Sequence, residues 1–288
     1  MKRISILICS TLLFSILIVG CQSKTKKGAE QMIATADSLI NIDALDSALE
    51  WLDSVKVVYP NEVESRRKAL EKSRNVRLEL SRRDSLASVE RLGLLEAYTD
   101  SLYQQFRLIP AKDMPDENIL RFRGYDPASK TPESPFIDAY VANDGTLELI
   151  ASASSTTQLN IVFIRISDRA NDTYILSDTL QYDGGLNYRY SNLGRHYERL
   201  TFAGKRGMPL GKFVALAPDN SRLGVEFCNE KGKAMVRFDL NQEARVAITN
   251  SYKYVAALEE MKEIYISLNK HEKRLQNSLN LNSAEKIR

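Results

Sequence analysis

The sequence has few of the residues from which catalytic and metal sites are most often built. Its 288 residues include two histidines, His196 and His271, and three cysteines, Cys9, Cys21 and Cys228. Neither histidine has a cysteine or another histidine at the spacing of a zinc ligand set. A Gly-x-Ser-x-Gly sequence for a serine nucleophile is also lacking. We therefore expect no metal, no cofactor and no enzymatic activity.

An excess of charge of one sign is lacking too. Lysine and arginine number 40 and aspartate and glutamate 37, so the formal net charge is only +3. A protein that binds nucleic acid by neutralising phosphates is usually far more basic, and we expect no nucleic-acid partner. The 43% of hydrophobic residues is ordinary for a folded protein. The length is sufficient for one large or two small domains with an apolar core.

Long hydrophobic runs are absent except at the N-terminus. The run Ile4–Val19 follows a positively charged start and is too short for a comfortable membrane span. It ends in Ile18, Val19, Gly20 and Cys21, which resemble the lipobox of bacterial lipoprotein precursors. In that family the cysteine is acylated and the preceding peptide is removed. The resemblance implies a signal peptide at 1–20 and a membrane anchor through acyl chains on Cys21.

The residues that follow the lipobox bear on location. Residues 21–28 form a polar, basic tether. In enteric lipoproteins an aspartate directly after the cysteine retains the protein in the inner membrane, so Gln22 favours the outer membrane. The run after it is basic rather than acidic, which favours a protein that faces the periplasm. With Cys9 removed and Cys21 lipidated, Cys228 is the single remaining thiol, and we expect no intramolecular disulfide.

A helical hairpin is predicted after the tether. Apolar residues recur at three- and four-residue intervals, with a break near Asp43, the expected N-cap of the second helix, and a stop at Pro60. Ala36, Ala48 and Leu52 stand where a tetratricopeptide unit places small and large apolar residues, and the hairpin resembles one such unit. Because the sequence has no second copy with this spacing, an ordinary helical hairpin is the alternative.

Two long helices are predicted on either side of a β region. The first completes the helical region 29–108, and its sparse apolar stripe with many charges is typical of a coiled-coil arm or of the solvated face of a packed helix. The second spans 241–280 and precedes a flexible tail at 281–288. We expect the C-terminal helix to pack on the first as a coiled-coil stalk. The expected stripe of the first helix is Leu70, Val76, Leu80, Ala87, Leu94, Tyr98 and Leu102.

The segment 109–240 changes to an alternating pattern and predicts an antiparallel β domain, either a sandwich or a curved sheet. The fold class is therefore α+β. The segment Gly204–Phe213 invites comparison with a phosphate-binding loop, but three residues separate its glycines and no hydroxyl residue follows Lys212. We expect a basic turn there, leading into a strand at Lys212–Leu216. The expected strands are 136–142, 146–153, 158–167, 173–180, 188–190, 196–202, 212–216, 223–228 and 234–240.

One stretch of the β region combines tyrosine with arginine and is the candidate ligand-binding site. Planar rings and guanidinium groups bind sugar faces and anions. The alternative is a hairpin whose tyrosines straddle core and solvent. The candidate residues are Tyr182, Tyr188, Arg189, Tyr190, Arg195 and Tyr197.

The sequence favours one function and leaves a second open. We expect a non-enzymatic lipoprotein of the cell envelope that binds another envelope protein through its helices. The alternative is a glycan- or cell-wall-binding module that uses the β domain. A hydrolase that used Cys228 with His196 is a weaker hypothesis, because an isolated cysteine in an apolar strand is usually a small buried hydrophobe.

Overall fold

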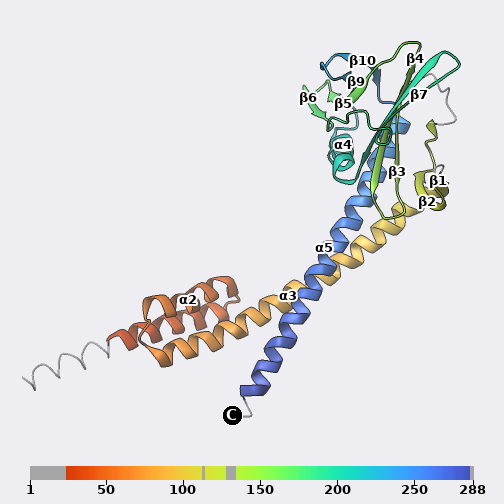
Figure 1. Ribbon diagram of the computed structural model, residues 1–288. Coiled ribbons are helices and arrows are strands. Elements are labelled where there is room, and N and C mark those ends of the chain that lie inside the picture. The colour runs from red at the N-terminus through yellow and green to blue at the C-terminus, as the bar shows by residue number, and fades with distance from the viewer. Residues whose placement is uncertain (1–23, 112–113, 128–133, 286–288) are drawn as a thin grey trace, which may run out of the picture. The chain divides into compact units, whose positions relative to one another are not determined.

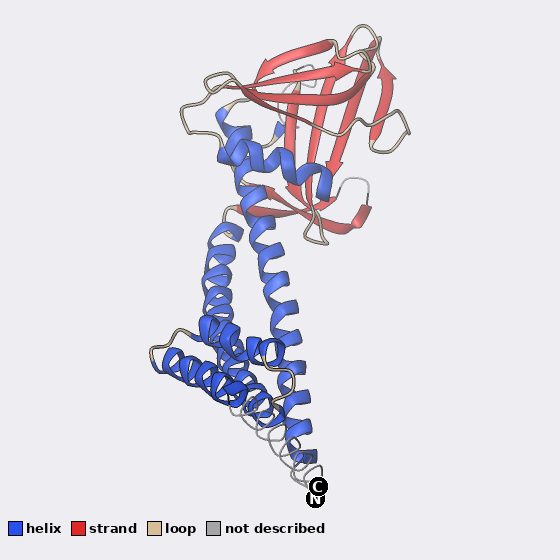
Figure 2. Cartoon of the chain, turned by 90° about the vertical axis from the view of Figure 1, so that its left-hand side faces the viewer, coloured by secondary structure: helices blue, strands red, loops and turns tan. Residues whose placement is uncertain are grey.

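The structure, a computed structural model, describes residues 24–111, 114–127 and 134–285. Its fold is α+β, as predicted, and the chain divides into two compact units. Unit 1 comprises residues 1–90 and 266–288, and unit 2 comprises Arg91–Tyr265. The described part of unit 1 is helical, and all described strands belong to unit 2 (Figures 1 and 2). The predicted signal peptide 1–20 and Cys21 lie outside the described residues.

Unit 1 contains the predicted helical hairpin. A helix at 24–41 is followed by α2 (Leu45–Val58) and the first part of α3 (Val63–Tyr103). The fully buried Ala36 and Ala48 belong to one apolar cluster, and α3 contributes Ala69 and Val76 to it. The hairpin therefore buries its apolar face against α3. The prediction that Asp43 caps α2 was wrong: Ala44 holds the cap position, and the Asp43 carboxylate accepts hydrogen bonds from Arg83 instead.

The two long helices, α3 and α5 (Gln242–Glu285), contact each other in both units. In unit 1 the Ser81 hydroxyl lies 2.9 Å from His271 Nδ1. In unit 2 Arg91 forms a two-point ion pair with Glu260, with Nε 2.7 Å from Oε1. The predicted pairing of the long helices is confirmed. The second helix continues five residues beyond the predicted end at 280.

The apolar stripe of α3 differs from the prediction within unit 2. Leu94 and Tyr98 are 61% and 42% exposed. Leu102 is buried as predicted, and the other buried positions are Leu92, Leu95 and Thr99. Residues spaced by four each time drift around a helix, whereas alternating intervals of three and four remain on one side. The sequence contains both series, and the residues at alternating intervals of three and four are the buried ones.

Unit 2 is an antiparallel sandwich of two sheets. The larger sheet has the order β1-β2-β3-β4-β8-β7 and the smaller one β10-β9-β5-β6. The strands are β1 (Phe106–Ala111), β2 (Met114–Phe122), β3 (Phe136–Val141), β4 (Leu147–Ser155), β5 (Ile161–Asp168), β6 (Thr173–Leu176), β7 (Asn187–Asn192), β8 (Arg195–Ala203), β9 (Leu223–Asn229) and β10 (Ala234–Asp239).

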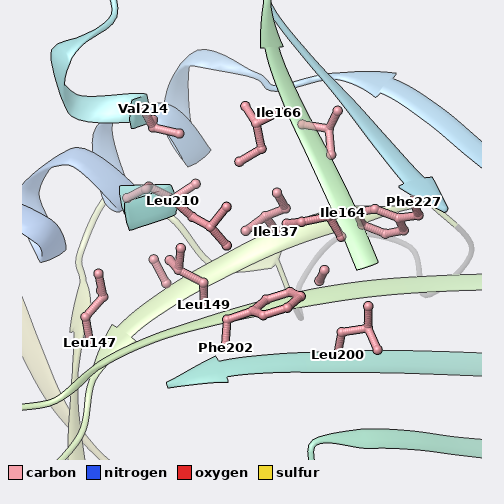
Figure 3. Packing of buried hydrophobic residues seen from close by; sticks show 14 of the residues in the cluster. Ile137, Leu147, Leu149, Ile164, Ile166, Leu200, Phe202, Leu210, Val214 and Phe227 are labelled. Atoms are coloured by element: carbon pink, nitrogen blue, oxygen red, sulfur yellow. The ribbon is translucent and has the colours of Figure 1, made fainter. Parts of the chain in front are cut away.

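The core of unit 2 joins side chains from both sheets, from the short helix α4 (Gly207–Leu216) and from α5 (Figure 3). Phe202 from the larger sheet and Phe227 from the smaller one are both fully buried. Leu210 and Val214 of α4 belong to the same cluster. Helix α4 therefore packs against the two sheets.

Two predictions for this region were wrong. The segment Lys212–Leu216 is part of helix α4, because buried residues recur at helical spacing from Gly207 and because glycine allows close packing. A Cβ atom at Gly207 would lie 2.5 Å from the backbone oxygen of Phe202. The long helix ends at Tyr103 rather than at 108, and β1 and β2 form before residue 136, where the first strand was expected.

Candidate ligand-binding site

The candidate tyrosines and arginines lie on or beside the β7–β8 hairpin, at one edge of the larger sheet. The register pairs Tyr190 with Tyr197 and Arg189 with Glu198. The two turn residues, Leu193 and Gly194, have φ of 48° and 76°. Positive φ at both central residues is the signature of a type I′ turn, whose twist matches that of the paired strands. A tight turn thus sets the register that brings the candidate residues together.

The tyrosines of the hairpin stack on one face of it. Tyr190 and Tyr197 have ring centroids 4.7 Å apart and an angle of 6° between ring planes, and Tyr188 lies 5.8 Å from Tyr190. Tyr188 and Tyr190 are 41% and 47% exposed. Side chains alternate along a strand, so the neighbouring positions, which include Arg189 and Glu198, face the other way. The hairpin presents aromatic rings on one face and polar groups on the other.

Arg189 is fixed by several partners. Its guanidinium donates to Asn160 Oδ1 at 2.9 Å and to the Ile161 carbonyl oxygen at 3.1 Å, and its Nε lies 3.5 Å from Glu198 Oε2. The guanidinium carbon also lies 5.2 Å from the centroid of the Tyr182 ring, within the range of a cation–π contact. Because its charge is already paired, Arg189 orients Tyr182 rather than offering a free cation to an anionic ligand.

Glu198 anchors this region, a role that sequence reasoning missed. The side chain is 2% exposed, and its carboxylate accepts hydrogen bonds from the backbone N–H groups of Leu159, Asn160 and Ile161 at 2.6, 2.8 and 2.7 Å. These bonds fix the chain where it crosses to the smaller sheet. Position 198 shares its strand face with the buried Leu200. Strand alternation alone therefore indicates an inward-facing glutamate, and that signal could have found it.

A hollow of about 250 Å³ lies at the hairpin. The sequence singled out half of its lining, namely Tyr182, Arg189, Tyr190 and Tyr197. It missed Gln158, Ser191, His196 and Glu198 as lining residues.

The remaining candidates, Tyr188 and Arg195, are not part of this lining. Tyr188 packs against Tyr190, and Arg195 donates to the Ser154 hydroxyl at 3.1 Å.

The chemistry of the lining is polar and aromatic. His196 Nδ1 lies 2.9 Å from the Ser191 hydroxyl, and Tyr182 is 59% exposed. Ligand pockets usually measure about 300–1,000 Å³, so a hollow of this size suits one ring of a ligand, or one unit of a polymer, rather than a large cofactor. Hydroxyl, amide and imidazole groups beside a tyrosine ring fit a ligand rich in hydroxyl groups.

The structure gives little support to a nucleophilic pair of Cys228 and His196. Cys228 is in β9 of the smaller sheet and is buried, whereas His196 is in β8 of the larger sheet. Burial raises the pKa of the Cys228 thiol and so disfavours the thiolate. Within the described ranges, histidine, cysteine, aspartate and glutamate form no group of three or more that could hold a metal ion.

Comparison of the chain with protein-family models, with curated proteins and with solved structures found no match. A search of the described helices for a membrane span found none that is both long and apolar enough.

Proposed function

We propose that this protein is a non-enzymatic component of the bacterial cell envelope, anchored by acyl chains on Cys21 to the outer membrane and facing the periplasm. We propose further that it binds another envelope protein through its helices. The lipobox-like sequence at Ile18–Cys21 supports the anchor. The location rests on Gln22 and the basic residues after it.

The observation that carries the interaction proposal is the set of large apolar side chains that the helices of unit 1 leave in solvent. On α2, Trp51 and Val58 are seven residues apart and 41% and 55% exposed, and on α3 Val63 and Leu70 have the same spacing and are 68% and 53% exposed. Seven residues are two helical turns, so each pair lies along one face of its helix. Single exposed apolar residues are common, but rows of them, with the chain's one tryptophan, are typical of interaction surfaces.

Crosslinking in envelopes tests this proposal. The lipidated protein and a Val58→Glu, Leu70→Glu variant would each be captured after crosslinking, and recovered proteins quantified. We expect a protein that the parent recovers to be lost with the variant. Leu108→Glu, in β1, is the matched control because Leu108 is similarly exposed at 57%. Equal recovery with all three chains would contradict binding through the helices.

A second function, glycan binding by the β domain, is supported by the hollow at the β7–β8 hairpin. A tyrosine ring opposed to hydroxyl, amide and imidazole groups offers both stacking and hydrogen bonds to a sugar. We expect Tyr182→Ala to abolish retention on isolated cell-wall polymer and Tyr188→Ala, which lies outside the lining, to preserve it. Equal retention of the two variants, with unchanged melting temperature, would rule out the hollow as the glycan site.

A further inference from the structure

A second, more apolar groove lies between strand β6 and helix α4 in unit 2, and it measures about 430 Å³. Pro209, Phe213 and Leu216 follow one another at helical spacing on α4 and line one side of the groove. Thr173 and Ile175 of β6 form the facing side, and the remaining lining residues are Asp168, Asn171, Lys212, Ala217 and Pro218.

Strand β6 is unlike the other edges of the two sheets. An exposed edge is usually protected by a charge or a proline within the strand, because its free backbone groups otherwise recruit another strand. Among the described edges, β1 contains Arg107 and Pro110, β7 contains Arg189 and β10 contains Arg237. The β6 sequence, Thr-Tyr-Ile-Leu, has neither a charge nor a proline.

The register of β6 shows which of its backbone groups face outward. Ser177 N–H donates to the Ile164 carbonyl oxygen at 2.9 Å, and Ile164 N–H donates to the Ser177 hydroxyl at 2.9 Å, so the bonding groups of residues 164 and 177 face each other. Such pairs alternate along an antiparallel ladder, and Ile166–Ile175 is therefore the next one. The N–H and C=O groups of Tyr174 and Leu176 consequently point away from β5, toward the open edge.

Buried polar side chains hold the far end of the groove in shape. Arg245, 7% exposed, donates to the carbonyl oxygens of Ala217 and Pro218 at 2.6 and 2.7 Å. Asp168, 2% exposed, accepts from the Ser221 hydroxyl at 2.8 Å and from the Asn171 amide at 2.7 Å. A preformed groove loses less conformational entropy when it is filled, which favours binding.

We propose that the groove between β6 and α4 binds an extended segment of a partner protein as an added β-strand. The segment pairs with the outward N–H and C=O groups of Tyr174 and Leu176. Alternate apolar side chains enter the groove against Ile175 and Phe213, since side chains of a strand point alternately to its two faces. The opposite face of the segment packs beside the Tyr174 and Leu176 side chains, which are 61% and 46% exposed.

The charge at the groove indicates an acidic partner segment. Two charged side chains line the groove. Asp168 is 2% exposed and already accepts hydrogen bonds from Ser221 and Asn171, whereas Lys212 is exposed and has no ion pair within the described part of the chain. A carboxylate of the segment, from a side chain or from a C-terminus, therefore matches it. A second copy of this chain fits less well, because it would bring its own α4 beside its own β6 and crowd the paired strands.

A peptide library displayed on phage, panned against the full chain after removal of residues 1–20, tests the proposal. We expect recovered peptides to alternate apolar residues and to contain an acidic residue. A labelled synthetic copy should bind in fluorescence polarisation, and a proline at its centre should abolish binding. Tyr174→Pro removes an outward N–H without breaking the ladder to β5, and it should weaken binding at least about tenfold, as should Leu216→Glu.

Two control variants show whether a loss of affinity is specific to this groove. Leu108→Glu should leave peptide affinity unchanged, and so should the Val58→Glu, Leu70→Glu variant, so that failure of this proposal and of binding through the helices are distinguishable. Each variant must keep the parent's melting temperature. Recovery of no such peptides, or equal affinity for Tyr174→Pro, would overturn the proposal. A dimer of the parent chain that Tyr174→Pro dissociates would also overturn it, because the occupant would then be a second copy.

Discussion

One carboxylate in each unit has a strongly shifted pKa, and the two shifts have opposite signs because the environments differ. Glu79 in unit 1 lies at the surface, and hydrogen bonds from Arg82 and Arg83 lower its pKa to about 2. Asp138 in unit 2 is 4% exposed, and burial raises its pKa to about 6 even though Arg121 donates to it at 2.6 Å. Removal from water disfavours the charged form, and here it outweighs an adjacent cation. For Asp138, burial therefore affects the pKa more than the ion pair with Arg121 does.

This difference bears on how each unit is held together. Surface ion pairs contribute little to stability because water and salt screen them, so unit 1 relies on its apolar cluster. In unit 2, a buried polar group that loses its hydrogen-bond partner cannot bond to water instead, so the loss destabilises the fold. Glu198, Asp168 and Arg245 each fix a loop, and those loops shape the hollow at the hairpin and the groove beside β6.

The largest effect predicted from this comparison is at Glu198. Glu198→Ala leaves the backbone N–H groups of residues 159–161 without their acceptor, and Leu159 and Ile161 are buried. We expect a loss of about 3 kcal/mol in the free energy of unfolding. Urea unfolding would measure the loss of stability, and native-state hydrogen exchange would show whether the loss lies in unit 2. Glu79→Ala should cost far less. Similar losses for the two substitutions would contradict the comparison.

The pH dependence of stability should differ in sign between the two carboxylates. The Asp138 pKa is raised from 3.8 to about 6 on folding, so the folded chain binds more protons between these values, and the stability contribution of Asp138 falls as pH rises through that range. Glu79 is lowered from 4.5 to about 2, so its contribution is present above pH 4.5 and is lost as pH falls toward 2.

Thermal unfolding from pH 3 to 7, with variants of each residue, would measure the two contributions. We expect Asp138→Asn to flatten the part of the profile between about pH 4 and 6, and Glu79→Gln to flatten only the acid side. An unchanged slope between pH 4 and 6 in Asp138→Asn would mean that Asp138 is ionised throughout this range.

Periodicity predicted most elements of this fold but few of the contacts that shape its sites. The strands near 147–153 and 223–228 formed as predicted, because alternation is a local property. The helix at Lys212–Leu216 was missed because five residues are too few to show a helical period. The period appears only when Gly207, Leu210 and Val214 are taken together, and Gly207 also packs closely against Phe202. Strand alternation indicates that Glu198 faces inward, but its hydrogen-bond donors lie in a loop 37 to 39 residues earlier in the chain, which no local pattern identifies.

The smallest effect concerns the turns of the two units. Asp43 in unit 1 and Leu193 in unit 2 both have positive φ, of 64° and 48°. Aspartate tolerates this conformation, whereas leucine is unfavourable there, and Leu193 is 95% exposed and so gains little packing in return. Leu193→Asn should therefore raise the free energy of unfolding by about 0.5–1 kcal/mol, as asparagine is preferred in type I′ turns.

Chemical denaturation would measure this gain, with Asp43→Asn as the control expected to change little. A gain at Leu193 alone would mean that the chain retains an unfavourable, exposed leucine at the tip of the hairpin that carries the hollow. Features that break a local rule without a structural return tend to mark functional positions, so the next comparison would be ligand retention by Leu193→Asn and Tyr182→Ala. A loss of stability with Leu193→Asn would instead show that the leucine makes a packing contact that offsets its strained backbone.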